Sequence, residues 1–319
     1  MVGLPQDSCR PQSRIYLKLI AGSVANQFGG QEEAGVTPII ESVVMRALSL
    51  NAVKFGFLLL LASCGGSDGF QPSVSQVQAT TLRYGQEAVI LVAGKYMRSD
   101  MVAETGTCTG PAFRANSGPE QAILTCKVTS AGPLTITIRA ANGERLHSAT
   151  LMVPLPRVLL ATSLGNVELE LNPLAAPITV NNFLDYVNSG FYRNTLFHRV
   201  IAGFVVQGGG FTKGLIKKDG QKSPITLESN VGLQNKRGTV AMARTSEPNS
   251  ATSEFFVNLS DNTALDYQSA STPGYAVFGK VLSGIDVIDS IAALPTATVG
   301  VFENVPTTDV TIIFVQQTQ

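Results

Sequence analysis

The stretch 197–212 reads FHRVIAGFVVQGGGFT, and the interpretation of the whole chain depends on it. Short apolar runs on either side of Gly203 predict two extended segments joined by a sharp turn, and the three glycines at 208–210 are expected to break the second segment. Arg199 lies inside an otherwise apolar strand, where a guanidinium group is unfavourable unless it is paired or used. The stretch therefore predicts a site around Arg199.

Length and composition indicate a globular protein with no general attraction for polyanions. The chain has 319 residues, of which 44% are hydrophobic and 14% charged, and this is enough for two packed domains. Lys plus Arg equals Asp plus Glu at 23 each, so nucleic acid is not an expected partner. Neither His147 nor His198 has the spacing of a metal ligand, and we expect no metal and no cofactor.

Residues 45–63, MRALSLNAVKFGFLLLLAS, have the features of a secretory signal peptide. Arg46 and Lys54 are basic, residues 55–61 are apolar, and small residues follow. The apolar run is shorter than the roughly 20 residues that span a bilayer. We expect translation to start at Met45, which makes residues 1–44 an upstream segment. The alternative interpretation of the segment that ends at Cys64 is a buried helix, or an ordinary signal peptide whose cysteine carries no lipid.

The sequence Leu61-Ala62-Ser63-Cys64 resembles the bacterial lipobox, in which the cysteine is acylated and becomes the first mature residue. Several acyl chains on Cys64 would anchor the protein stably. Residues 64–73 are small and polar, and they are interpreted as a tether. Gly65 after the cysteine is typical of outer-membrane lipoproteins rather than inner-membrane ones. The expected location is therefore the periplasmic face of a membrane, with the outer membrane favoured.

Residues 74–154 predict a small β-sandwich of immunoglobulin-like type. Residues 88–92 are apolar, residues 134–140 alternate, and Asn142-Gly143 is a hairpin turn before a strand at 148–153. The region has no acid/base pair, so it is interpreted as a spacer or binding module, with His147 exposed.

Cys108 and Cys126 are the two cysteines that remain in the expected mature chain. An even pair in an oxidising compartment indicates a disulfide. The alternative is a pair of buried free thiols.

Residues 157–317 resemble the cyclophilins, the peptidyl-prolyl cis/trans isomerases, after a boundary marked by Pro154 and Pro156. The resemblance is carried by FHRVIAGFVVQGG, which follows the family pattern F-H-R-x-I-x-G-F-x-x-Q-G-G, and by PNSATS at 248–253 before a strand. It implies a mainly β fold: a closed eight-stranded antiparallel barrel capped by two helices, with the sandwich before it. The first helix is expected to open at Pro177, and the apolar residues Val180, Phe183, Leu184 and Val187 follow it at helical spacing.

The resemblance also implies a site. Arg199 would donate a hydrogen bond to the prolyl nitrogen, and Gln207 would orient the substrate. The pocket for the proline ring would be lined by Phe204, Val205, Phe256 and Leu265. The groove for the substrate backbone would be formed by Ala243, Arg244 and Thr245.

Four positions depart from the family pattern. Glu254 replaces a usual Gln, and its carboxylate can either fix Arg199 or draw it away from substrate. Val205 replaces a commoner Met, and Tyr275 replaces the His of many eukaryotic members. Ala264 occupies the place of an aromatic residue, so weak cyclosporin binding is expected. His198 is interpreted as a structural residue with its hydrogen bonds satisfied.

These patterns support two functions. The first is a prolyl isomerase acting on proline-containing unfolded or exported polypeptides, which the combination of Arg199, Gln207, Phe204 and Phe256 favours. The second is a chaperone module that binds proline peptides with weak or no catalysis, and the unusual residue at 254 together with Ala264 favours it.

Overall fold

The computed structural model describes residues 71–114 and 118–319. The expected signal peptide, Met45, the predicted lipidation site Cys64 and the predicted upstream segment 1–44 lie outside the described residues, as does most of the predicted tether. No helix in the described part of the chain combines the length and apolar character that crossing a membrane requires.

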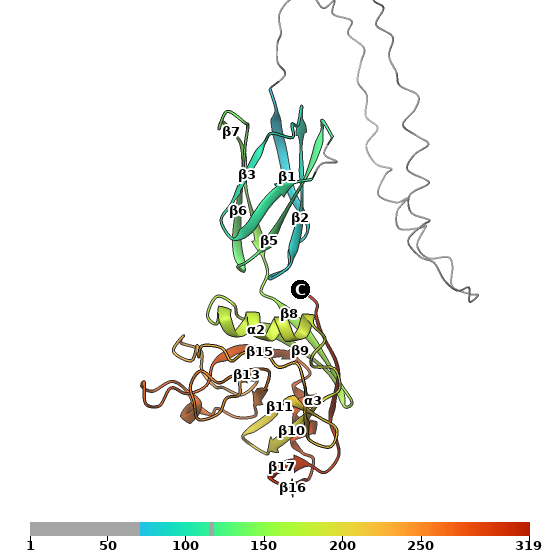
Figure 1. Cartoon of the computed structure of the whole chain (residues 1–319), viewed down its shortest axis with the longest axis vertical. Helices are drawn as coiled ribbons and strands as arrows, with labels where there is room; N and C mark the ends of the chain where they lie inside the picture. Colours follow the sequence, from blue (N-terminus) through green and yellow to red (C-terminus); the bar gives the residue numbers. More distant parts are fainter. Residues whose placement is uncertain (1–70, 115–117) are drawn as a thin grey trace, which may run out of the picture. The chain divides into compact units, whose positions relative to one another are not determined.

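The first half of the described chain folds into two antiparallel sheets (Figure 1). The four-stranded sheet has the order β1-β2-β5-β4 and the three-stranded sheet the order β3-β6-β7. Their strands are β1 (Ser73–Thr81), β2 (Glu87–Lys95), β3 (Val102–Thr105), β4 (Cys108–Phe113), β5 (Gln121–Val128), β6 (Gly132–Arg139) and β7 (Arg145–Val153).

Alternation of side chains gives these two sheets a common core. In β6, Leu134, Ile136 and Ile138 are fully buried, and they pack in one cluster with inward residues of β2 and β5. The predicted sandwich is therefore present, while its immunoglobulin-like relationship stays a prediction. Cys108 and Cys126 form a disulfide across β4 and β5, as expected.

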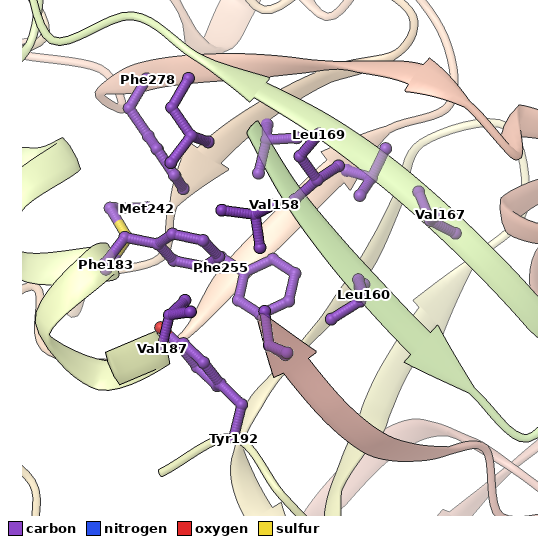
Figure 2. Packing of buried hydrophobic residues seen from close by; sticks show 14 of the residues in the cluster. Val158, Leu160, Val167, Leu169, Phe183, Val187, Tyr192, Met242, Phe255 and Phe278 are labelled. Atoms are coloured by element: carbon purple, nitrogen blue, oxygen red, sulfur yellow. The ribbon is translucent and has the colours of Figure 1, made fainter. Parts of the chain in front are cut away.

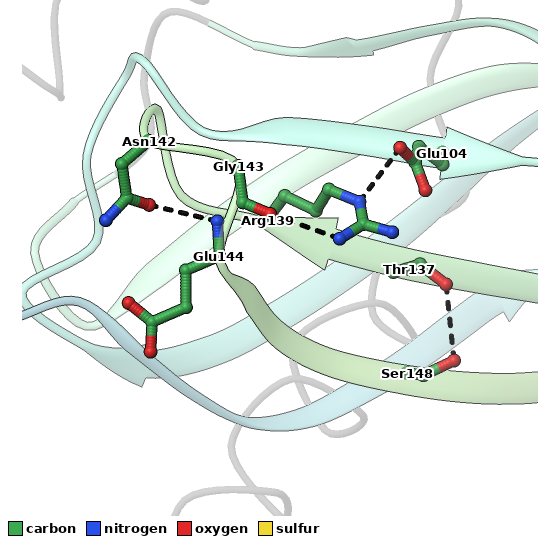
Figure 3. Close-up of polar contacts among 7 residues, drawn as sticks. All are labelled: Glu104, Thr137, Arg139, Asn142, Gly143, Glu144 and Ser148. Atoms are coloured by element: carbon green, nitrogen blue, oxygen red, sulfur yellow. Dashed lines mark hydrogen bonds and ion pairs between the residues drawn. The ribbon is translucent and has the colours of Figure 1, made fainter.

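The hairpin between β6 and β7 turns at the predicted Asn142-Gly143. Gly143 has a φ of +86°, and the Glu144 N–H donates to Asn142 Oδ1 at 3.0 Å (Figure 3). Arg139 donates to the Gly143 carbonyl and pairs with a carboxylate of β3. The prediction for His147 was wrong: it is half-buried, because it lies within β7 in register with Ile138 rather than in the turn.

The second half forms one closed barrel. Eight antiparallel strands run in the order β10-β18-β8-β9-β15-β13-β14-β11, and the pairing of β10 with β11 closes the ring. The short strand β12 pairs antiparallel with the end of β11, and β16 and β17 form a separate hairpin. The strands are β8 (Arg157–Thr162), β9 (Gly165–Leu171), β10 (Thr195–Ile201), β11 (Val205–Thr212), β12 (Ile216–Lys217), β13 (Thr239–Met242), β14 (Phe255–Asn258), β15 (Val277–Ser283), β16 (Thr296–Val299), β17 (Phe302–Pro306) and β18 (Thr311–Gln317).

Two helices accompany the barrel, α2 (Pro177–Asn188) and α3 (Ile285–Ala292). Pro177 opens α2 as predicted, and the Glu228 carboxylate accepts hydrogen bonds from the first-turn N–H groups of residues 178 and 179. Phe183 and Val187 on its inner face lie in the barrel core with Val158 and Phe255 (Figure 2). The closed barrel and both helices agree with the predicted fold class.

In the barrel, one local prediction failed and one hairpin was missed. The glycines at 208–210 do not end the strand, because β11 continues through them. A Cβ at Gly208 would lie 2.8 Å from the Leu196 carbonyl oxygen, so glycine lets the two backbones approach. The β16–β17 hairpin was also missed, since β16 has only four residues and all of them are exposed.

Candidate active site

The site is assembled by register across neighbouring strands. Arg199 of β10 lies opposite Gln207 of β11, which in turn lies opposite Phe256 of β14. Phe256 faces Ala241 of β13, and Ala241 faces Val277 of β15. Because cross-strand partners have adjacent side chains, five strands place a cation, an amide and an aromatic ring side by side.

A β-bulge at His198 changes where the β10 side chains point. Phe197 pairs with Gly208 and Arg199 pairs with Gln207, so His198 is the extra residue. In a regular strand His198 and Arg199 would face opposite sides of the sheet. A bulge redirects side chains locally, and here both residues approach the same polar cluster.

A cavity of about 350 Å³ lies at this point on the barrel wall. Its walls combine an apolar hollow with a few polar groups. It is lined by Arg199, Phe204, Val205, Gln207, Ala243, Arg244, Phe256, Leu265 and Tyr275. All nine residues are among those singled out in the sequence, and they come from segments up to 76 positions apart, from 199 to 275.

The apolar side of the cavity is a small cluster distinct from the main barrel core. Val205, Ala241, Phe256 and Val277 are buried in it, and partly buried Phe204 and Leu265 are among the residues that pack against them. The Phe256 and Tyr275 rings meet edge to face with centroids 5.6 Å apart. The hollow is therefore walled by fixed rings and aliphatic side chains.

Arg244 separates this cavity from a second one. Its guanidinium lies 4.6 Å from the Tyr275 ring centroid and donates through Nε to the Gly274 carbonyl. The second cavity, of about 400 Å³, shares Gln207, Ala243 and Arg244 with the first. Thr245 and Glu254 line this second cavity rather than the first. It is also lined by residues that sequence reasoning did not place at the site: Lys217, Gln221, Pro224, Ser250 and Thr252.

Comparisons with known proteins agree with this geometry. Residues 157–317 match the family model described as cyclophilin type peptidyl-prolyl cis-trans isomerase. The chain belongs to this family.

Curated relatives cover the cyclophilin half of the chain. Peptidyl-prolyl cis-trans isomerase A of Dickeya dadantii is 53% identical over 155 residues, which are 49% of this chain and 80% of that protein. Peptidyl-prolyl cis-trans isomerase B of Escherichia coli is 48% identical over 153 residues, which are 47% of this chain and 93% of that protein. A Cryptosporidium parvum cyclophilin crystallised in the presence of the dipeptide Ala-Pro is 27% identical, covers 51% of this chain and 99% of its own, and has a TM-score of 0.44.

A chain of hydrogen bonds crosses the polar side of the cyclophilin site. Arg199 Nη1 donates to Gln207 Oε1 at 3.2 Å, and Gln207 Nε2 donates to Glu254 Oε2 at 2.9 Å. His198 Nε2 lies 3.3 Å from the same carboxylate oxygen. The suggested direct pair of Glu254 with Arg199 is therefore not what the structure shows, because Gln207 stands between them.

The same contacts explain the charge of Glu254. Burial by itself raises the pKa of the Glu254 carboxyl. This effect is outweighed by contacts that lower the pKa: the hydrogen bond and charge of His198, the hydrogen bond from Gln207 and the charge of Lys217. The net pKa lies below its ordinary value, so Glu254 is ionised at neutral pH. His198 is buried, and its Nδ1 has no partner among the described residues, so it is not the fully satisfied core residue that was expected.

The described residues contain no group of three or more His, Cys, Asp or Glu side chains arranged to hold a metal ion. What the cyclophilin site offers is a fixed cationic hydrogen-bond donor beside an apolar hollow of side-chain size. This arrangement is suited to binding a ring-shaped apolar residue and acting on the polar bond next to it.

Proposed function

We propose that Arg199 accelerates rotation about a prolyl peptide bond by donating to its nitrogen. The barrier to rotation is about 18–20 kcal/mol, because the nitrogen lone pair is delocalised into the carbonyl. At the twisted transition state the lone pair returns to nitrogen, which then accepts a hydrogen bond. A guanidinium aimed at that nitrogen binds the twisted form better than the planar one, and such differential binding is what catalysis requires.

The observation that carries this proposal is the position of Arg199 at the edge of the apolar cavity. Gln207 accepts a hydrogen bond from the guanidinium there, and the hollow of about 350 Å³ lined by Phe256 and Leu265 is large enough for a proline ring. A charge-assisted hydrogen bond contributes about 1.5–3 kcal/mol, which corresponds to roughly one or two decades of rate. Holding and desolvating the peptide in the hollow supplies the remainder.

The test is isomerisation of a short Ala-Pro peptide in a protease-coupled assay. Arg199→Ala is expected to lower kcat/KM at least tenfold. Arg193→Ala removes an exposed arginine of the same domain and should match wild type. Equal rates for wild type and Arg199→Ala would refute the proposed role of the guanidinium.

We further propose that the enzyme acts on exported polypeptides while anchored by a lipid on Cys64. The lipobox-like residues 61–64 support the anchor, and the buried disulfide between Cys108 and Cys126 is typical of an oxidising compartment. Fractionation of a bacterial host should place the full chain in the membrane and Cys64→Ala in the soluble periplasmic fraction. Recovery of both proteins in the cytoplasm would reject this location.

Weak binding of cyclosporin is part of the same proposal. Ala264 lies exposed in the short 3₁₀ helix η1 (Thr263–Leu265) and presents only a methyl group, where the family pattern has an aromatic ring. Inhibition of the peptide assay by cyclosporin is expected only at concentrations well above those of the enzyme. Stoichiometric inhibition at an enzyme concentration near 1 μM would contradict it.

A further inference from the structure

Four polar side chains connect the interior of the barrel to the proposed catalytic group. They are His198, Glu254, Gln207 and Arg199, and we call them the polar network. Each link lies within hydrogen-bond reach: 3.3 Å from His198 Nε2 to Glu254 Oε2, 2.9 Å from Gln207 Nε2 to the same oxygen, and 3.2 Å from Arg199 Nη1 to Gln207 Oε1.

Gln207 lies between Glu254 and Arg199, and the chemistry of these two groups allows its amide only one orientation. An ionised carboxylate only accepts hydrogen bonds, and a guanidinium only donates them. The amide of Gln207 lies between the two, so its NH₂ must face Glu254 and its oxygen must face Arg199. A flipped amide would set oxygen against carboxylate and NH₂ against guanidinium, and both contacts would be repulsive.

With a neutral amide at position 254, Arg199 alone would select the orientation of Gln207. The usual Gln of the family pattern carries both a donor and an acceptor, so it can satisfy Gln207 in either orientation. Only one of those orientations presents an acceptor to Arg199. The carboxylate therefore adds a constraint that comes from its charge and not from its shape.

The surroundings of Glu254 hold the carboxylate in place. Its side chain is 24% exposed, and that of His198 only 5%. The imidazole ring is packed against Phe211, with centroids 4.7 Å apart. A Cβ at Gly210 would lie 2.5 Å from Glu254 Cγ, so this glycine leaves the space that the Glu254 side chain fills. His198 of β10 and Gln207 of β11 thus contact the carboxylate, and Gly210 of β11 leaves room for its side chain.

We propose that Glu254 is a positioning residue that, through its ionised carboxylate, fixes the orientation of the Gln207 amide and thereby holds Arg199 toward the substrate. The inference rests on the proposed role of Arg199. It differs from the earlier alternatives for Glu254, because the carboxylate neither touches Arg199 nor competes with substrate for it.

The first experiment measures kcat and KM separately for Glu254→Gln by exchange spectroscopy on an Ala-Pro peptide. In this variant Arg199 alone orients the Gln207 amide, so a flipped fraction that lacks the bond to Arg199 becomes populated, and kcat should fall by up to about twofold if that fraction reaches half of the enzyme. KM should change less, because residue 254 does not line the proline cavity. Glu303→Gln makes the same chemical change at an exposed position on β17 and should leave both constants at the wild-type values.

A double-mutant cycle tests the route of the effect. In a Gln207→Leu background, Glu254→Gln should have no further effect on kcat, since the amide through which Glu254 acts is gone. Gly210→Ala supplies a second variant that keeps the carboxylate but displaces it, and it should lower kcat as Glu254→Gln does. A rise in kcat for Glu254→Gln, an unchanged kcat, or an equal loss in both backgrounds would overturn the proposal.

A spectroscopic readout separates this inference from the proposed function. In ¹⁵N-labelled wild type, one Gln207 Nε2 proton is expected at low field because it is bonded to a carboxylate, and it should move to higher field in Glu254→Gln. Arg199→Ala is measured alongside. If that variant keeps wild-type activity, the proposed catalytic role fails, whereas an unmoved Gln207 proton in Glu254→Gln refutes the orientation by Glu254 itself.

Discussion

At the scale of single residues, the site depends on groups that are common alone and specific together. An arginine in a strand, an amide and a phenylalanine acquire a role because register places Arg199, Gln207 and Phe256 in one row across three strands. The identities of these residues could be read from the sequence through the family pattern. The link from Glu254 to Gln207 could not, because it depends on which side-chain atoms meet.

The ionised state of Glu254 makes a prediction about acid stability. Its folded pKa lies below the ordinary value of 4.5, so its charged form stabilises the fold above that pH, and the contribution is lost as pH falls through the lower folded value. The difference in free energy of unfolding between wild type and Glu254→Gln should therefore shrink as the pH falls below 4.5. Denaturant unfolding at each pH measures it, and a difference that grows on acidification would contradict the charge assignment.

At the scale of elements, the barrel strands and helices were largely predictable and the irregularities were not. Helix α2 was predicted from Pro177 and the spacing of Val180, Phe183, Leu184 and Val187, all of which are buried. The bulge at His198 leaves no trace in hydrophobic periodicity, since an inserted residue is identified only by its partner strand. The continuation of β11 through its glycines was also missed. These glycines are required by close packing against neighbouring strands, and strand propensity does not show that.

The middle glycine of that run should be sensitive to substitution. Gly209 has a φ of +89°, and a Cβ there would lie 2.9 Å from the Tyr192 ring and 3.0 Å from both the Phe255 ring and the Ser253 carbonyl oxygen. Gly209→Ala should reduce the free energy of unfolding by about 2–5 kcal/mol, from backbone strain plus overpacking. Gly214→Ala is a matched control: its φ is +79°, its nearest neighbour is 3.9 Å away, and strain alone should cost about 1–2 kcal/mol. Equal losses for the two variants would show that close packing at Gly209 contributes nothing.

At the scale of the whole molecule, the order of a sandwich followed by a barrel was predictable because the two halves have different patterns. Strand-like segments around residues 88–92 and 134–140 occur before Pro154, and the cyclophilin pattern occupies residues 157–317. The β16–β17 hairpin escaped prediction because its first strand, residues 296–299, has only four residues and buries none of them. Whether Cys108 and Cys126 were bonded or free was open in the sequence and is decided by the pairing of β4 with β5.

The disulfide should affect the stability of the sandwich but not the chemistry of the barrel. It closes a loop with a sequence separation of 18, for which chain entropy gives a stabilisation of about 3 kcal/mol. Reduction of wild type should lower the unfolding midpoint of the sandwich, while peptide isomerisation by the folded enzyme keeps its rate. The double variant Cys108→Ser/Cys126→Ser should not respond to reductant. An isomerisation rate that falls on reduction before any unfolding would contradict this independence.

The most direct test of the central claim is a crystal structure of the protein bound to an Ala-Pro peptide analogue with a twisted prolyl bond. The account predicts the proline ring in the hollow lined by Phe256 and Leu265, with an Arg199 Nη atom about 3 Å from the prolyl nitrogen and Gln207 still accepting from the guanidinium. A peptide bound elsewhere, or a guanidinium turned away from the prolyl nitrogen while the ring occupies the hollow, would contradict it.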